Sequence, residues 1–226
     1  MPISTMDAVP TIVETIRALR PASVLDVGVG FGMWGVLLRS TLEMREGAER
    51  YHKRDWAVTI DGVEVFEAYR NPIYAFAYDT VHIGDVCDLA GSLPAYDVVL
   101  LGDVIEHIPF EQGRRLLDTL AERTGKAIIV VTPRGDMAQE GVFGNPREEH
   151  VSNWTAPDFR RWPNARVRTV SRRTLVALIP TGATDARLVN PFRGRFVGRL
   201  RSLASRVLAR LIGRRRLARL ARGAGS

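Results

Sequence analysis

Glycines and an acidic residue follow a short apolar segment near the N-terminus, and together they are suited to binding a small charged ligand. The segment reads Val24-Leu-Asp26-Val-Gly28-Val-Gly30-Phe-Gly32. Glycine permits sharp turns and lets the backbone come close to a ligand. A helix that follows such a turn presents unpaired N–H groups at the same place. The segment therefore predicts a cofactor loop between a strand and a helix.

Three further acids, Glu64, Asp85 and Asp103, come just after predicted strands. Ligands of open α/β sheets bind beyond the carboxyl ends of the strands, so we expect these acids to share one site with the glycine loop. Carboxylates accept hydrogen bonds from ribose hydroxyls, from an exocyclic amine and from an ammonium group. A nucleoside with an amino-acid end and no phosphate fits all of them.

Two other nucleotide-binding patterns fit less well. Counted from Gly28, the third glycine is Gly32, which comes one position too early for a dinucleotide GxGxxG loop. No GxxxxGK[ST] loop is present. An acid at the mouth of the loop, Asp26, would also repel a pyrophosphate. Taken singly, Asp26 and Asp85 are equally well explained as strand-end or helix-cap residues, so the interpretation depends on all four acids together.

The elements that position these residues follow from hydrophobic periodicity. Residues 45–56 are a predicted polar insertion and residues 134–153 a long irregular loop. Strands alternating with helices predict a doubly wound α/β sheet. The predicted strands are 24–27, 57–64, 81–84, 96–101 and 127–132 with a closing antiparallel pair at 166–171 and 175–179, and the main predicted helices are 6–19, 34–44, 110–123 and 155–162.

In these motifs the chain resembles the class I S-adenosylmethionine-dependent methyltransferases over roughly residues 20–180. The resemblance rests on LDVGVGFG (25–32), IDGVEVFEAY (60–69), GDVCDL (84–89) and YDVVLLGDVIEHI (96–108). It implies a Rossmann-like sheet of seven strands, mostly parallel with the last strand antiparallel. It also implies S-adenosylmethionine as cofactor, with S-adenosylhomocysteine as product. The motifs single out no metal ligands, and they leave metal dependence open.

The same resemblance implies a role for each motif residue. It implies that Glu64 and the neighbouring Val65 bind the ribose. The spacing from the glycine loop to Glu64 is longer than usual, so Asp61 remains an alternative. Asp103 would lie beside the sulfonium and the acceptor. The resemblance places the methionine end against Asp26, Gly28, Gly30 and Gly32, and adenine against Asp85 and Val86.

The chain also looks like a narrower, poorly characterised bacterial subgroup of that family. The likeness rests on a second strand that reads WAVTIDGVEVF (56–66) and on a late loop that reads GNPREEHVSNWTAPDF (144–159). This resemblance supports the fold and the cofactor but implies no acceptor.

Four residues are candidates for a general base that removes a proton from a hydroxyl acceptor: Asp103, Glu106, His107 and His150. Our catalytic candidates are His107, Asp103 and His150, with packing or a helix cap as the alternative for His107 and Glu106. We expect His150, Glu149, Asn153 and Trp154 to form a polar and aromatic set suited to a sugar. The motif after the fourth strand is not Asn/Asp-Pro-Pro-Tyr, which argues against exocyclic amines. O-methylation of a small molecule or glycan intermediate is therefore the predicted reaction.

Charge is distributed unevenly along the 226 residues. Residues 186–226 hold twelve arginines and no acid, whereas the rest of the chain carries a net charge of −5. Segment 192–220 combines an apolar stripe at helical spacing with arginines on the other side, as in helices that lie on an anionic membrane. This pattern favours a membrane surface or a partner protein over nucleic acid.

These observations predict a methyltransferase domain at 1–182 and an arginine-rich amphipathic extension at 183–226. One cysteine, no secretory signal and no membrane-length apolar run predict a cytoplasmic protein. The arginine-rich segment adds the expectation that it associates with the inner membrane face. RNA or protein methylation, with the extension as a docking arm, is the alternative enzyme hypothesis. A cofactor-binding scaffold without catalysis is the non-enzyme alternative.

Overall fold

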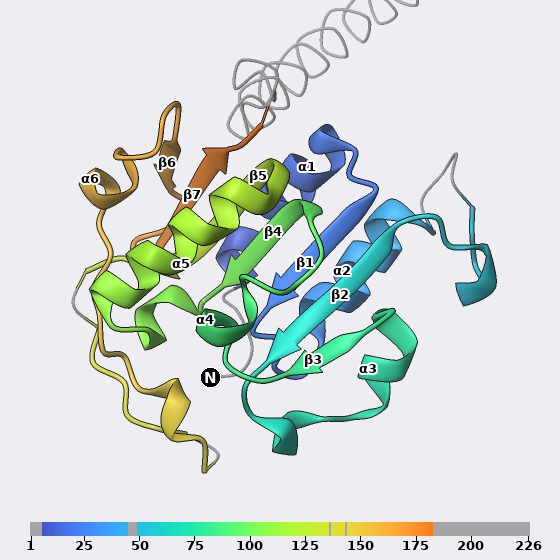
Figure 1. The fold of residues 1–226 in the computed structure, drawn as a ribbon, viewed down its shortest axis with the longest axis horizontal. Helices are drawn as coiled ribbons and strands as arrows, with labels where there is room; N and C mark the ends of the chain where they lie inside the picture. Colours follow the sequence, from blue (N-terminus) through green and yellow to red (C-terminus); the bar gives the residue numbers. More distant parts are fainter. Residues whose placement is uncertain (1–5, 45–48, 136, 143, 183–226) are drawn as a thin grey trace, which may run out of the picture. The chain divides into compact units, whose positions relative to one another are not determined.

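Seven strands form one sheet in the order β3-β2-β1-β4-β5-β7-β6 in this computed structural model (Figure 1). The structure describes residues 6–44, 49–135, 137–142 and 144–182. The neighbouring pairs among β1 to β5 are parallel, whereas β7 runs antiparallel to both β5 and β6. The predicted seven-stranded, doubly wound sheet with an antiparallel last strand is confirmed.

The elements have the following bounds. The strands are β1 (Ser23–Val27), β2 (Thr59–Glu64), β3 (Val81–Ile83), β4 (Tyr96–Gly102), β5 (Thr124–Pro133), β6 (Arg166–Thr169) and β7 (Thr174–Pro180). The α-helices are α1 (Val9–Leu19), α2 (Met33–Leu42), α3 (Pro72–Ala77), α4 (Val86–Leu89), α5 (Phe110–Arg123) and α6 (Ala156–Phe159). Short 3₁₀ turns include η4 (Ile105–His107) and η5 (Pro146–Glu148).

Several element predictions need correction, and the fifth strand, for example, begins at Thr124 rather than residue 127. The second strand begins at Thr59 rather than residue 57, because the N–H groups of Ala57 and Val58 donate to Oε1 of Glu43 at 3.0 and 2.7 Å. The helix predicted at 155–162 ends at Phe159, although Thr155 does cap it. Helix α4 was not predicted, because four residues are too few to show a helical period.

Two apolar layers cover the two faces of the sheet. Leu25 and Val27 of β1 belong to the cluster that includes the apolar side of α5, and Val24 belongs to the cluster that includes α1 and α2. Figure 1 shows α4 and α5 in front of the sheet and α1 and α2 behind it. Successive side chains of a strand point to opposite faces, so Asp26 shares the α1–α2 face with Val24. This alternation decides the position of Asp26 in the site.

A fully buried arginine ties α2 to the edge of the sheet. Arg39 is 0% exposed, and its guanidinium donates at 2.8 Å to the carbonyl of Ala77, at 2.5 Å to the carbonyl of Val58 and at 2.8 Å to the carboxylate of Asp79. The buried carboxylate of Glu43 lies 3.7 Å away, one helical turn along. A buried guanidinium is tolerated only when its donors are satisfied, and here they anchor α2 to the chain that flanks β2.

The predicted extension at 183–226, including its amphipathic segment 192–220, lies outside the described residues. Within the parts of the chain that the structure does describe, no helix is both long and apolar enough to cross a bilayer.

Replacing Arg39 with methionine should lower the free energy of unfolding by about 3 kcal/mol, because it leaves buried acceptors without donors. The matched control is Arg54→Met, since Arg54 is exposed and pairs with its neighbour Asp55 at 3.8 Å. The control should change stability by less than about 0.5 kcal/mol. Urea unfolding of both variants measures the difference, and equal effects would contradict a structural role for Arg39.

Candidate functional site

A cavity lies at the carboxyl ends of the strands β1, β2, β3 and β4. Each strand end or the turn after it contributes lining residues, among them Gly28, Glu64, Asp85 and Asp103. Because the strands are parallel, their carboxyl ends meet at the same edge of the sheet. The predicted convergence of the motifs on one site is therefore confirmed.

The glycine loop forms one wall of this cavity. Gly28 and Gly30 line it and have φ angles of 77° and 53°. A Cβ at Gly28 would lie 2.4 Å from Cγ2 of Val104, so the loop after β4 approaches too closely for any side chain there. Gly32 does not line the cavity. It precedes α2 with a φ of 88°, and a Cβ there would meet Ile73, so its role is to let the helix begin.

Glu64 holds the glycine loop in place from the end of β2. Its Oε2 accepts from the Gly30 N–H and its Oε1 from the Phe66 N–H, both at 2.8 Å. Burial raises the pKa of this carboxyl, and the two amides oppose that rise. Val65 also lines the cavity, as predicted. The alternative, Asp61, is excluded because its carboxylate accepts from Thr80 N–H and the Tyr96 hydroxyl away from the cavity.

Asp85 and Val86 both line the cavity, at the start of α4. The Asp85 side chain also caps this helix by accepting from the Cys87 N–H at 2.9 Å. Its other oxygen forms an ion pair with Arg147 at 3.0 Å. Asp85 therefore both caps α4 and lines the cavity, and its predicted contact with adenine stays a prediction.

Asp26 does not lie at the mouth of the loop, contrary to the prediction. It is 0% exposed, does not line the cavity, and accepts from the Tyr78 hydroxyl at 2.5 Å. The other carboxylate oxygen, Oδ1, has no hydrogen-bond partner within the described residues. Burial raises the pKa of Asp26 to about 7, and the nearby charge of Glu64 adds to the rise. The alternation of β1 turns Asp26 beneath the loop, where it supports the loop without reaching the cavity.

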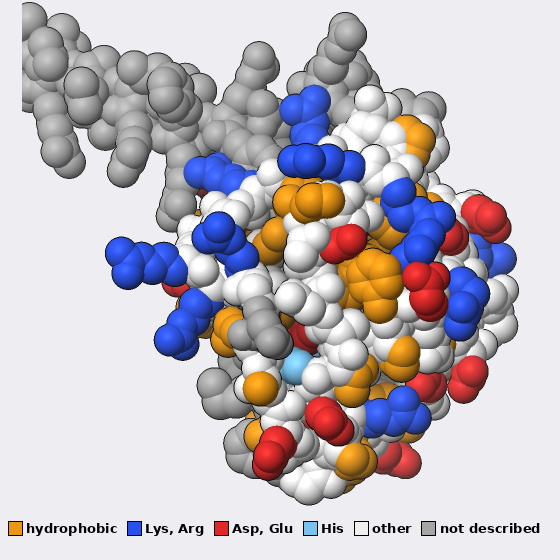
Figure 2. Space-filling model, turned by 90° about the vertical axis from the view of Figure 1, so that its left-hand side faces the viewer, with side chains coloured by type: hydrophobic (Ala, Val, Ile, Leu, Met, Phe, Trp, Pro, Cys, Tyr) orange, Lys and Arg blue, Asp and Glu red, His pale blue; other side chains and the backbone are white. Residues whose placement is uncertain are grey.

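The catalytic candidates divide between two cavities. Asp103, with a φ of 55°, and His107 line the first one. His150 and Glu106 line a second cavity of about 280 Å³ instead. The rings of His107 and His150 are nevertheless 5.0 Å apart between centroids, so this pair lies between the two cavities. Figure 2 shows one face of the molecule, on which a histidine side chain lies among acidic and hydrophobic side chains.

The predicted sugar-binding set around His150 is only partly present. Asn153 lines the second cavity with His150. Trp154 is a core residue that is 1% exposed and packs between Phe110 and Phe159 in tilted ring contacts. Although it is among the residues that line the second cavity, its burial leaves too little exposed surface for it to serve as a platform for a ligand.

The late loop contributes residues that the sequence analysis missed. Asn145, Arg147 and Glu148 line the first cavity, opposite the turns of the sheet. Oε1 of Glu148 accepts from the Tyr69 hydroxyl at 3.2 Å, which anchors the loop near the end of β2. The GNPREEH motif was noted, but its distance in the sequence from the strand ends concealed this contact.

Acidic side chains dominate the electrostatics of the first cavity. The acids that line it are Glu64, Asp85, Asp103 and Glu148, and the arginine among the described lining residues is Arg147. Since Arg147 is already paired with Asp85, the cavity favours a cationic ligand and disfavours a pyrophosphate.

No protein-family model matches the sequence, and the search among curated proteins finds no match. Solved structures do match. An O-methyltransferase family protein from Burkholderia thailandensis is 15% identical with a TM-score of 0.51, over 77% of this chain and 55% of that chain. This chain thus spans about half the length of that protein.

Two further structures resemble the chain. The plantazolicin methyltransferase BamL, solved with a triazolic substrate analogue and SAH, is 11% identical with a TM-score of 0.53, over 78% of this chain and 85% of that one. A DhpI–SAH complex is 15% identical with a TM-score of 0.52, over 71% and 77%. At these identities the likeness is one of fold, and the chain has the fold of the class I methyltransferases.

Stability should depend on pH through Asp26. Its pKa is near 3.8 in the unfolded chain and about 7 in the folded protein. In the pH window between these two values, the Asp26 carboxyl keeps its proton in the folded protein and loses it in the unfolded chain. Its contribution to stability is therefore present at low pH and falls as pH rises through the window. Asp26→Asn removes this titration. The stability of the variant relative to the natural protein should rise by about 2 kcal/mol between pH 5 and pH 7.

Urea unfolding of both proteins in matched buffers measures this difference, and contributions from other groups cancel in it. A difference that stays constant over the window would show that Asp26 keeps an ordinary pKa.

Proposed function

We propose, on the premise of this fold, that the protein is an S-adenosylmethionine-dependent methyltransferase and that the cavity at the ends of β1 to β4 binds the cofactor. The observation that carries the proposal is the acidic lining of that cavity, with four carboxylates and one paired arginine. S-adenosylmethionine carries a sulfonium and an ammonium and no phosphate, so its charge complements this lining. The bound cofactor supplies a methyl group activated by the positive sulfur.

The residues present fit the parts of this cofactor. Glu64 keeps further lone pairs on both oxygens beyond the two amides that it accepts from, and these suit the ribose hydroxyls. Asp85 and Val86 line the cavity and would contact adenine, while Gly28 and Gly30, which also line it, would contact the methionine end. The late loop lines the opposite side of the cavity through Asn145, Arg147 and Glu148.

The acceptor class that we propose is a hydroxyl of a small molecule or glycan intermediate. The second cavity supports this because polar side chains line part of its wall, among them Thr132, His150 and Asn153. The ring of His107, which lines the first cavity, lies 5.0 Å from that of His150 between centroids, so an acceptor held in the second cavity would lie near the cofactor. The similarly folded O-methyltransferase family protein from Burkholderia thailandensis points to the same chemistry.

Glu64→Gln should weaken the affinity for S-adenosylhomocysteine by roughly tenfold to a hundredfold, because hydrogen bonds to a charged group contribute about 1.5–3 kcal/mol. The matched control is Glu67→Gln, three residues along the chain, whose exposed carboxylate pairs with Arg70 and does not line the cavity. The control should bind as the natural protein does. Isothermal titration calorimetry measures all three dissociation constants.

Absence of binding by the natural protein would overturn the cofactor assignment. Transfer itself is tested with labelled S-adenosylmethionine and panels of hydroxyl and amine acceptors. We expect product only with hydroxyls. Binding of the cofactor without transfer to any acceptor would favour the scaffold hypothesis.

The arginine-rich segment 192–220 is proposed to dock the protein on an anionic membrane, and the support for this comes from the sequence. Its apolar stripe would enter the interface while its arginines face the lipid headgroups. Docking there would bring membrane-bound glycan intermediates to the site. RNA or protein methylation, with the same segment as docking arm, is the competing function.

The full-length protein should therefore co-sediment with vesicles that contain phosphatidylglycerol but not with pure phosphatidylcholine. Binding should decrease with added salt, because screening weakens attraction between exposed charges. A variant with Arg214, Arg215 and Arg216 changed to glutamine should bind more weakly. Tight binding to RNA with no binding to anionic vesicles would instead favour the RNA methyltransferase hypothesis.

A further inference from the structure

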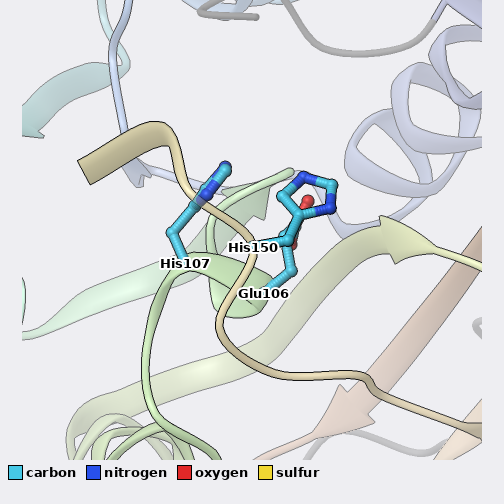
Figure 3. Close-up of side chains that lie close together, drawn as sticks. All are labelled: Glu106, His107 and His150. Atoms are coloured by element: carbon cyan, nitrogen blue, oxygen red, sulfur yellow. The ribbon is translucent and has the colours of Figure 1, made fainter. Parts of the chain in front are cut away.

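Glu106, His107 and His150 form a cluster that the cofactor assignment does not explain. One nitrogen or oxygen from each side chain lies within 4.8 Å of those of the other two. Figure 3 shows that Glu106 and His107 extend from the same turn after β4, while His150 comes from the late loop that crosses it. The cluster therefore joins two segments that lie more than forty residues apart in the sequence.

The Glu106 carboxylate lacks a partner that would offset its burial. Glu106 is 2% exposed, and neither oxygen has a hydrogen-bond partner within the described residues. A buried carboxylate without donors is costly to keep charged unless a cation lies beside it.

Both histidines are oriented so that each keeps one free nitrogen lone pair. Nδ1 of His107 lies 2.9 Å from the carbonyl oxygen of Glu149, and Nδ1 of His150 lies 2.6 Å from that of Met137. A carbonyl oxygen can only accept, so Nδ1 carries the proton in each neutral ring. Nε2 is then left as an acceptor. Histidines that ligate metals are commonly oriented in this way, by a hydrogen bond from the other ring nitrogen.

The backbone holds the two segments together independently of the side chains. The carbonyl oxygen of Glu106 accepts from the N–H groups of Val151 and Ser152 at 2.9 and 3.0 Å. The Ser152 hydroxyl also donates to the carbonyl of Ile105 at 3.2 Å. The three side chains are therefore presented by a preformed frame, as a metal site requires.

We propose that Glu106, His107 and His150 bind a divalent transition-metal cation. Two imidazole nitrogens with one carboxylate oxygen suit Mn²⁺, Fe²⁺, Co²⁺ or Zn²⁺ better than Mg²⁺ or Ca²⁺, which prefer oxygen ligands alone. Metal–ligand bonds of about 2.0–2.2 Å separate ligand atoms by about 3–4 Å. The observed limit of 4.8 Å requires only a small inward movement of the side chains.

The position of the cation gives it a function in the reaction. His107 lines the first cavity, whereas Glu106 and His150 line the second, so the metal lies between the two. Three protein ligands leave coordination positions for oxygen atoms of the acceptor. A metal-bound hydroxyl loses its proton more readily than a free one, and the proton passes to solvent. This use of the site rests on the proposed methyltransferase function, whereas metal binding itself does not.

The test measures metal binding by the full-length, tag-free protein after treatment with a chelator and without cofactor. Titration with Mn²⁺, followed by electron paramagnetic resonance of the free ion, should show one bound ion per chain. Co²⁺ should give visible absorption bands that report nitrogen ligands. Glu106→Gln and His150→Gln should each weaken Mn²⁺ binding at least tenfold. The control His52→Gln, an exposed histidine outside both cavities, should bind as the natural protein does.

Glu106→Gln keeps the shape of the side chain and removes a buried charge, so it should remain folded, as circular dichroism can verify. No binding of Mn²⁺, Co²⁺ or Zn²⁺ at millimolar concentration would overturn the proposal. Equal affinity of both variants and the natural protein would overturn it as well.

Titration with S-adenosylhomocysteine separates this proposal from the cofactor assignment. Glu106 does not line the cofactor cavity, so Glu106→Gln should keep its cofactor affinity within about threefold while losing the metal. A protein that binds Mn²⁺ through these residues but no cofactor would retain the metal site and refute the proposed function. Loss of metal and cofactor together in Glu106→Gln would show disruption of the site and overturn the metal assignment.

Discussion

The Glu64 carboxylate is the interaction on which the shape of the site depends. It accepts from Gly30 in the loop after β1 and from Phe66 in the turn after β2, both at 2.8 Å. The N–H groups of Gly28 and Val29 meanwhile donate to the carbonyl of Val63 in β2. Two neighbouring parallel strands thus end in turns that are bonded to each other. The turn after β4 packs closely against this pair at Gly28, where a Cβ would lie 2.4 Å from Cγ2 of Val104, so only glycine allows the three turns to come together around the cavity.

Charge in this region is arranged in two layers. The upper layer lines the cavity and is acidic, which suits a cationic ligand. Asp26 forms the lower layer, buried beneath the glycine loop and hydrogen-bonded to Tyr78. Tyr78 also accepts from the N–H of Gly35 in α2 at 2.9 Å, so the acid helps to position the helix that follows the loop. Asp26 in β1 therefore affects the ligand site indirectly. Through Tyr78 it helps to position α2, the helix that follows the glycine loop.

The late loop lines both cavities. Residues 145–148 cover the first cavity, and residues 150–154 line the second. The bonds from Val151 and Ser152 to the carbonyl of Glu106 fix the loop at the point between them. His150 reaches His107 only because of this anchoring. One segment thus shapes the cofactor cavity, the proposed acceptor cavity and the proposed metal site, and these three cannot vary independently.

The sequence by itself determined the sheet, the order of its elements and the residues that gather at its carboxyl edge. These properties depend on local periodicity and on the rule that parallel strands end at one edge, so Gly28, Glu64, Asp85 and Asp103 were correctly brought together. The resemblance favoured Glu64 over Asp61 for the ribose, and the fold gives the physical reason to set Asp61 aside, because its carboxylate accepts from the Thr80 N–H and the Tyr96 hydroxyl.

The tertiary structure alone decided which face each side chain takes and which distant segments meet. The alternation along β1 turned Asp26 away from the cavity, and Trp154 became part of the hydrophobic core, where it packs against Phe110. Arg147 and Glu148 joined the first cavity, and His150 joined Glu106 and His107, because a long loop crosses the edge of the sheet. The path of such a loop is set by long-range hydrogen bonds and packing, which leave no periodic signal in the sequence.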